Sequence, residues 1–184
     1  YTEADNPGTV LTRDEEGMPF YNGDTQADFM IRVPCSLIVD PRPAPILQYG
    51  HGLLGERSEA RTGYLSEMIN VNGWVLLAMD WTGMSSEDVM NIVLMSAGDP
   101  SDFAMIPERS MQGFVEKLAG MRMVMGAFSD DDVVKFQDDA GNLVSIVDSE
   151  RRYYYGNSQG AILGGALVAL SPDIERAVLG VGGF

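Results

Sequence analysis

One pentapeptide constrains the fold of this chain more than any other feature: residues 156–160, Gly-Asn-Ser-Gln-Gly. It follows an aromatic run at 153–155 that is typical of a strand and precedes a run of small and apolar residues at 161–170 that is typical of a helix. Gly-x-Ser-x-Gly in this context predicts a sharp strand-to-helix turn that lifts a serine hydroxyl above the edge of a sheet. The flanking glycines allow the strained backbone that such a turn needs.

Two further motifs lie upstream, each directly after an apolar run. The sequence His-Gly-Leu-Leu-Gly at 51–55 follows the run 45–49, and Asp-Trp-Thr-Gly at 80–83 follows the run 74–79. Together with the pentapeptide, these motifs resemble those of the α/β-hydrolase superfamily, in particular of its serine esterase and lipase branch. The second glycine that usually ends the Asp-x-x-Gly turn of that family is absent, so this motif matches in part.

The resemblance implies an α/β fold, a mostly parallel sheet covered by helices, that is incomplete in this chain. Residues 28–184 would form the amino-terminal portion of the hydrolase domain, and the polar, turn-rich residues 1–27 an arm or hairpin. The alternation of strand-like and helix-like segments joined by short turns favours the same architecture.

Several local expectations follow from the residues. A strand at 29–39, interrupted by Pro34, should lie at a sheet edge or contain a bulge, with Cys35 as a buried thiol. A helix at 58–70 should start with Ser58 as its N-cap and end before Gly73, and 176–181 should be a buried strand.

Two segments, one rich in methionine and one acidic, can each be interpreted in more than one way. The methionine-rich residues 87–128 should hold two or three helices, which either pack in the core or form a flexible cap or pocket wall. The acidic residues 130–142 favour a solvated hairpin, because their spacing does not fit a calcium-binding loop. We expect no metal and no cofactor.

Charge excludes some partners. The net charge of −15 and a pI near 4.2 argue against nucleic acid and against an anionic membrane surface. No apolar run approaches the roughly 20 residues that span a bilayer. The single cysteine does not reveal the compartment, and a secreted or periplasmic location is favoured over others.

The resemblance also assigns site residues. Ser158 would be the nucleophile. Leu53 and Gln159 would supply the oxyanion hole through their backbone amides, so that their side chains are replaceable, while His51 and Gly52 would shape the loop that carries Leu53. Asp80 would brace its own turn.

These motifs do not supply the catalytic acid and the catalytic histidine. His51 is the only histidine, and the family's order is serine, then acid, then histidine. Asp173 and Glu175 precede the last expected strand, which puts them at the opposite end of the sheet from Ser158. We therefore expect the acid and the histidine to come from sequence beyond Phe184, so that the carboxy-terminal remainder of the same hydrolase is the partner of this portion.

These inferences predict a serine hydrolase that cleaves small-molecule carboxylic esters through an acyl-enzyme. Two alternatives remain. One is a serine peptidase of the same fold, and the other is a non-catalytic binding protein that retains the hydrolase fold.

Overall fold

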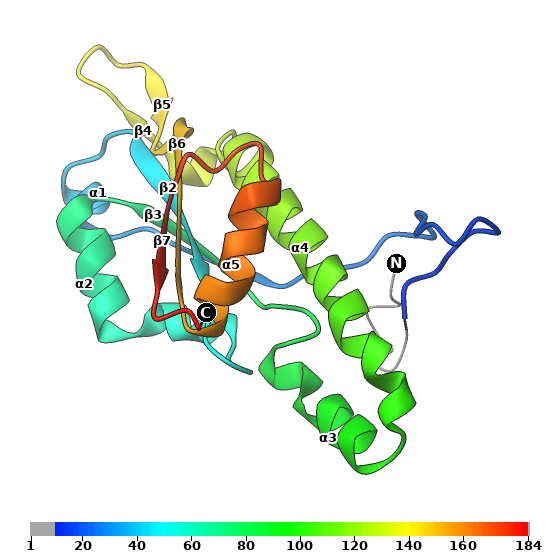
Figure 1. Ribbon diagram of the computed structural model, residues 1–184. Coiled ribbons are helices and arrows are strands. Elements are labelled where there is room, and N and C mark those ends of the chain that lie inside the picture. Colours follow the sequence, from blue (N-terminus) through cyan, green and yellow to red (C-terminus); the bar gives the residue numbers. More distant parts are fainter. Residues whose placement is uncertain (1–9, 184) are drawn as a thin grey trace.

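The computed structural model describes residues 10–183, which form a five-stranded sheet with helices on both faces (Figure 1). In spatial order the strands are β1 (Phe29–Arg32), β3 (Val75–Met79), β2 (Ala44–Gly50), β6 (Val147–Asn157) and β7 (Arg176–Gly180). β1 is antiparallel to β3, and all other neighbours are parallel. The predicted mostly parallel sheet is confirmed, as is the edge position of the strand that begins at Phe29.

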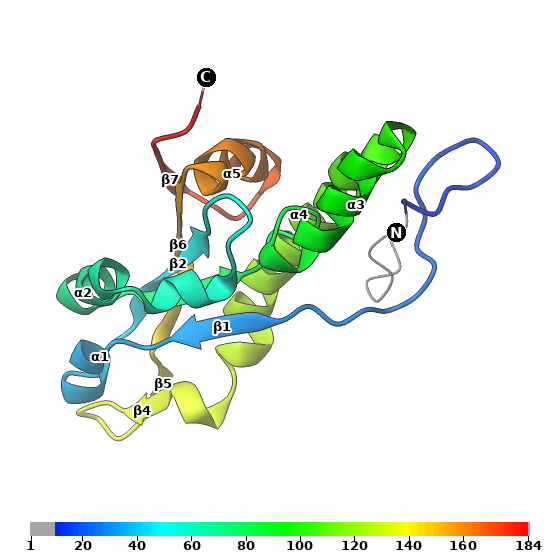
Figure 2. The ribbon, with the colours of Figure 1, turned by 90° about the horizontal axis from the view of Figure 1, so that it is seen from below.

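Helices connect the strands. They are α1 (Cys35–Val39), α2 (Gly63–Asn72), α3 (Val89–Ala97), α4 (Met105–Met123) with a π-helical continuation (Val124–Phe128), and α5 (Gln159–Leu170), together with the 3₁₀ turns η1 (Arg57–Arg61), η2 (Ser86–Asp88), η3 (Pro100–Ala104) and η5 (Asp132–Val134). Figure 2 shows α2 on one side of the sheet and α4 and α5 on the other. None of the helices within residues 10–183 is long and apolar enough to cross a membrane.

The two faces of the central strands belong to different hydrophobic clusters. On the α2 side, Leu47 lies in one buried cluster with Ile69. On the opposite side, Ile46 lies in another with Met121 of α4. Every residue of β2 and β3 is buried, because successive side chains of a strand point to opposite faces and both faces are covered. This accounts for the continuous apolar runs at 45–49 and 74–79.

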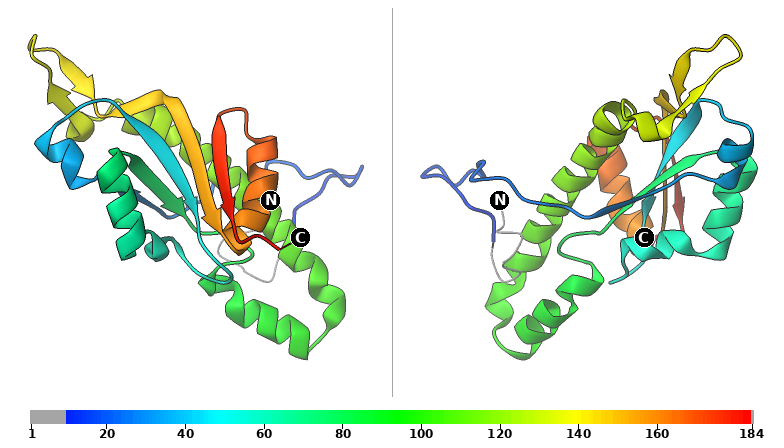
Figure 3. Two further views of the ribbon diagram at one scale, coloured as in Figure 1. Left: turned by 60° about the vertical axis from the view of Figure 1, so that its left-hand side comes forward. Right: turned by 180° about the vertical axis from the view of Figure 1, so that it is seen from behind.

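Two parts of the chain project from opposite ends of the molecule (Figure 3). The antiparallel hairpin of β4 (Lys135–Gln137) and β5 (Leu143–Ser145) extends from one end, which agrees with the predicted solvated hairpin. At the other end, beyond the carboxyl ends of the parallel strands, α3 lies beside the start of α4, and η3 joins the two helices.

The methionine-rich segment divides between the two interpretations that the sequence left open. Met105 and Met121 are buried in the core, whereas Met90 and Met111 are half or more exposed. α3 contributes no buried residue at all. Its apolar side chains therefore lie at the surface of the molecule and not in its core.

Three local predictions were wrong. Cys35 is exposed, because the chain after Pro34 turns into the short helix α1 instead of continuing the strand. Ser58 lies inside η1, and α2 begins only after Thr62. The strand that begins at Arg176 is exposed rather than buried, because among the described residues β7 is an edge strand.

Only part of the predicted amino-terminal arm can be compared with the structure, since residues 1–9 lie outside the described part of the chain. From residue 10 to 27 the chain runs mostly without regular structure, apart from one bridge between Arg13 and Pro19. It is attached to α4 through Glu108, whose carboxylate accepts the Leu11 N–H at 2.7 Å and pairs with Arg13 at 2.8 Å.

Candidate active site

Ser158 stands in a strained turn between β6 and α5. Its backbone angles are φ 54° and ψ −121°, and a positive φ is uncommon for residues other than glycine. The residue is exposed, while its backbone N–H donates to the carbonyl oxygen of Gly180 at 2.9 Å. The predicted strand-to-helix turn is therefore present, and it exposes Ser158 at the carboxyl end of the parallel strands. That Ser158 acts as a nucleophile stays a prediction.

Both glycines of the pentapeptide are required by close backbone contacts. A Cβ atom at Gly156 would lie 2.2 Å from the carbonyl oxygen of Gly160, and one at Gly160 would lie 2.2 Å from that of Gly50. These distances are far inside van der Waals contact, and the obstructing atoms are backbone that cannot move aside without shifting the sheet or the helix. The sequence pattern thus reflects the close approach of α5 to the ends of β2 and β6.

His51 is fully buried, and both of its ring nitrogens have hydrogen-bond partners. Nε2 accepts a hydrogen bond from the backbone N–H of Trp81 at 2.8 Å, so the proton resides on Nδ1, which donates to the carbonyl oxygen of Gly52 at 2.8 Å. Burial lowers the pKa of His51 below its ordinary value. The neutral imidazole ties the loop after β2 to the turn after β3, and it cannot accept a proton without losing a bond.

Further hydrogen bonds fix the loop at 51–55. The Glu59 carboxylate accepts the N–H of Gly52 at 3.0 Å and the hydroxyl of Tyr49 at 3.1 Å. Within the loop, Gly55 N–H donates to the Gly52 carbonyl at 3.1 Å, and the Gly55 carbonyl accepts the N–H of Ser86 at 2.9 Å. The loop is therefore held by backbone and side-chain contacts on both sides. Nothing in the sequence pattern pointed to Glu59.

Neither the backbone N–H of Leu53 nor that of Gln159 has an acceptor within residues 10–183. Gln159 is the first residue of α5, where an N–H has no partner inside the helix. The neighbouring loop amide, that of Leu54, is occupied by the side chain of Gln159 at 3.3 Å. The two amides that the resemblance assigns to an oxyanion hole are therefore both unoccupied within the described residues.

The side chains of Leu53 and Gln159 differ in their burial and in their contacts. The side chain of Leu53 projects into solvent, with 67% of the residue exposed, so its replacement should be tolerated. Gln159 is only 5% exposed, and both ends of its amide make hydrogen bonds. These contacts predict that replacing the Gln159 side chain is costly, in contrast to the expectation from sequence.

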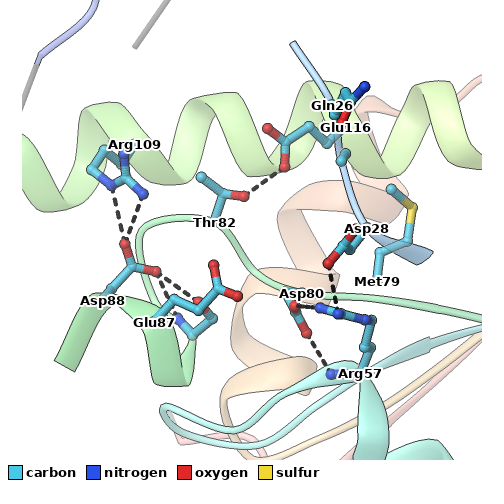
Figure 4. A pocket seen from close by; sticks show the side chains of 12 residues that line it. Gln26, Asp28, Arg57, Met79, Asp80, Thr82, Glu87, Asp88, Arg109 and Glu116 are labelled. Carbon is cyan, nitrogen blue, oxygen red and sulfur yellow. Dashed lines mark hydrogen bonds and ion pairs between the residues drawn. The ribbon is translucent and has the colours of Figure 1, made fainter. Parts of the chain in front are cut away.

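A polar cavity of about 250 Å³ lies at the carboxyl end of β3. Figure 4 shows the side chains that line it. Asp80 accepts the backbone N–H of Arg57 at 2.5 Å and also pairs with its guanidinium, which reaches Asp28 at 2.7 Å. Asp80 therefore links its turn to Arg57, just beyond the loop at 51–55, which agrees with the predicted loop-bracing role.

A second ion pair lines the same cavity. The buried Arg109 of α4 pairs with Asp88 at 3.0 Å, and Asp88 in turn accepts hydrogen bonds from the backbone and hydroxyl of Ser85 at 3.0 and 2.8 Å. Ser158 is not among the lining residues. The charged groups of the cavity are thus largely engaged with one another, and they stabilise the chain after β3.

Lys117 of α4 is fully buried beneath this turn. Its Nζ donates to the carbonyl oxygen of Met79 at 2.6 Å and lies 4.1 Å from the ring centroid of Trp81, within range of a cation–π interaction. Burial lowers the pKa of Lys117 to about 7. Trp81 is therefore held from two sides, by His51 at its backbone and by Lys117 at its ring.

The described residues bring no base or acid to Ser158. Its hydroxyl has no hydrogen-bond partner in the described part of the chain. Asp173 pairs with Arg122, and Glu175 pairs with Arg152 at 3.0 Å, both before β7 and so at the opposite end of the sheet. Among residues 10–183, no group of three or more His, Cys, Asp or Glu side chains is placed to bind a metal ion.

Comparison with known proteins gives matches among solved structures only. No family model and no curated protein matches the sequence. The acylaminoacyl peptidase of Pyrococcus horikoshii is 16% identical with a TM-score of 0.52, over 86% of this chain and 21% of that one. A carboxyl esterase from Bacillus coagulans is 13% identical with a TM-score of 0.47, over 81% and 37%. Acetyl xylan esterase 1 from Thermoanaerobacterium is 20% identical with a TM-score of 0.44, over 76% and 40%.

With its strand order, its Ser158 turn and its likeness to the peptidase, the chain has the α/β-hydrolase fold, of which it contains a part. It spans 21% of the length of the peptidase and 40% of that of the acetyl xylan esterase. At these identities the likeness defines the fold, and any chemistry must be argued from the site itself.

Proposed function

We propose that this chain carries the nucleophile and the oxyanion hole of a serine hydrolase that cleaves carboxylic esters. The observation that carries the proposal is the backbone of Ser158, which has a φ of 54° and lies between two glycines, Gly156 and Gly160, where any Cβ atom would clash with backbone. Strain of this kind persists where the surrounding structure enforces it, and it clusters at functional sites. The exposure of Ser158 at the start of a helix, where the helix dipole favours negative charge, supports the same role.

In this mechanism the Ser158 Oγ attacks the acyl carbon of the ester while a general base takes its proton. The carbonyl oxygen becomes an oxyanion, which accepts hydrogen bonds from the N–H groups of Leu53 and Gln159. The base then protonates the departing alkoxide, which leaves as the alcohol. Water then attacks the acyl-enzyme while the same base takes its proton, and the base returns this proton to the Ser158 Oγ as the acyl–Oγ bond breaks and the carboxylic acid leaves. Removing one such oxyanion donor costs roughly 3–4 kcal/mol in other serine hydrolases.

The base and its orienting acid are proposed to come from sequence beyond Phe184. His51 is unsuited, because it is buried, neutral and bonded at both nitrogens. The carboxylates of Asp173 and Glu175 are engaged in ion pairs at the other end of the sheet. The carboxy-terminal remainder of the hydrolase is therefore the proposed partner, and it would pack along the exposed edge of β7.

α3 provides a surface that suits an apolar acyl group. It begins three residues after Ser86, whose N–H binds the loop at Gly55. Its exposed apolar side chains include Met90 at 64%, Val93 at 53% and Leu94 at 62%. This favours the pocket-wall interpretation of the methionine-rich segment and an ester with an apolar acyl chain as substrate.

The test compares esters with amides on the full-length protein. We expect turnover of p-nitrophenyl esters, and a loss of at least about 1,000-fold in kcat with Ser158→Ala, with unchanged thermal unfolding. Hydrolysis confined to peptide p-nitroanilides would instead favour the serine peptidase. The absence of both activities would favour the non-catalytic binding protein.

A further inference from the structure

The side chain of Gln159, the residue after the proposed nucleophile, joins three segments at one point. Its Oε1 accepts the backbone N–H of Leu54 at 3.3 Å, and its Nε2 donates to the carbonyl oxygen of Met84 at 2.8 Å. The residue is 5% exposed. One carboxamide thus connects the start of α5 to the loop after β2 and to the turn after β3.

The bond to Leu54 acts at a strained point of that loop. Leu54 has a φ of 50°, a conformation that leucine rarely adopts unless its surroundings enforce it. On the other side of Leu53, the N–H of Gly52 is held by Glu59 at 3.0 Å. The peptide that carries the unoccupied Leu53 N–H is therefore fixed from both sides, by Glu59 through Gly52 and by Gln159 through Leu54.

We infer that the Gln159 side chain is a positioning residue for the oxyanion hole, and this rests on the proposed function. The backbone N–H of Gln159 is one proposed donor, and its side chain sets where the other, that of Leu53, lies relative to it. A donor that moves by about 1 Å can cost on the order of 100-fold in rate. The side chain itself does not touch the substrate.

The chemistry of the two contacts requires a carboxamide. One atom must accept from an N–H, and the other must donate to a carbonyl oxygen. Methionine fills a similar volume but supplies neither bond. Glutamate keeps the acceptor, but when ionised it turns an unprotonated oxygen towards the Met84 carbonyl. When protonated, glutamate can restore the donor, and this distinguishes a hydrogen-bonding role from simple space filling.

The experiment uses the full-length protein with Gln159→Met and Gln159→Glu, and with Gln112→Met as a control. Gln112 is also buried and donates to Glu116 at 2.9 Å, but it lies on α4, and no hydrogen bond joins it to the loop in the described part of the chain. We expect Gln159→Met to lower kcat by about 10- to 100-fold with little change in KM. Relative to wild type at each pH, Gln159→Glu should recover as the pH falls from 8 to 5. Gln112→Met should retain kcat within about threefold.

A second measurement does not depend on activity. Amide hydrogen exchange at residues 51–55 should accelerate at least tenfold in Gln159→Met and stay unchanged in Gln112→Met. Faster exchange without any ester hydrolysis by the wild type would refute the proposed function while leaving the contact intact. The inference would be overturned if Gln159→Met kept the wild-type kcat and the wild-type exchange rates. It would also be overturned if Gln112→Met lost as much kcat as Gln159→Met, or if the ratio of the Gln159→Glu kcat to the wild-type kcat stayed constant across this pH range.

Discussion

The hydroxyl of Tyr154 donates a hydrogen bond of 2.5 Å to the carbonyl oxygen of Gly160, directly beneath the turn that presents Ser158. Tyr154 is 1% exposed, and its ring occupies the space that side chains at Gly156 and Gly164 would need. One aromatic side chain of β6 therefore defines how closely α5 approaches the sheet, and so where the turn lies.

This relationship predicts opposite effects for two adjacent glycines of α5. A Cβ atom at Gly164 would lie 2.4 Å from the ring of Tyr154, whereas one at Gly165 would come no closer than 3.7 Å to Leu179. Gly164→Ala should lower the free energy of unfolding by about 1–3 kcal/mol through overpacking. Gly165→Ala should raise it by up to about 1 kcal/mol, because alanine favours the helix. Urea denaturation of both variants measures the difference. Equal effects at the two positions would contradict the packing described for Tyr154.

The burial of Lys117 predicts how the free energy of unfolding depends on pH. Burial lowers its pKa from 10.5 to about 7 in the folded protein, against the opposing effect of the carboxylates of Asp80 and Glu116. Between pH 7 and the unfolded value the unfolded chain binds more protons, so the free energy of unfolding should rise with pH. The rise should approach at most about 1.4 kcal/mol per pH unit.

The matched variant is Lys117→Met, which keeps an unbranched apolar stem and cannot titrate. Its free energy of unfolding, measured by urea denaturation at pH 7, 8 and 9, should change less with pH than that of the wild type. The same pH dependence in both proteins would show that Lys117 does not carry the effect.

Substitutions of Leu53 distinguish the role of its backbone N–H from that of its side chain. Its exposed side chain makes no required contact, so Leu53→Ala should change kcat by less than about threefold. Leu53→Pro removes the N–H and should lower kcat by about 100-fold or more. Steady-state kinetics on p-nitrophenyl esters would show this, with circular dichroism to check that both variants fold. Similar losses in the two variants would rule out a role for the Leu53 amide.

The missing base predicts that residues 1–184 do not hydrolyse esters by themselves. The Ser158 hydroxyl has no partner among the described residues, and β7 leaves Val178 62% exposed at the sheet edge. Adding the carboxy-terminal remainder, either covalently joined or as a separate polypeptide, should restore turnover and cover this edge. Ester hydrolysis by purified, monomeric residues 1–184 would refute the need for a second segment.

The elements that sequence predicted well are those fixed by local chemistry. The apolar runs at 45–49 and 74–79 are strands buried on both faces, and Gly73 ends α2 with a φ of 64°. The turn at Ser158 was predictable because the pentapeptide contains the glycine that the turn itself requires, Gly156, where a Cβ atom would meet the Gly160 carbonyl four residues later. Cys35 was not, because the pattern after Pro34 fits a strand or a short helix equally, and tertiary contacts decide between them.

From the sequence, the backbone groups of the site could be predicted, but the side-chain contacts that hold them could not. Gln159 binds Met84 and Leu54, which precede it by 75 and 105 positions, and no local pattern encodes such contacts. The same is true of Arg109, whose partner Asp88 lies 21 positions away. Side-chain networks that join separate loops depend on the fold, so they became visible only with the structure.

The central claim is that Ser158 is an activated nucleophile, and a fluorophosphonate probe tests it most directly. Such probes phosphonylate a serine whose hydroxyl is activated by a base and flanked by oxyanion donors. In the full-length protein, peptide mass spectrometry should place a single adduct on Ser158, with none in Ser158→Ala and an undiminished one in Ser86→Ala, which alters an exposed serine of the neighbouring turn. Absence of the adduct from Ser158, or its persistence in Ser158→Ala, would contradict the account.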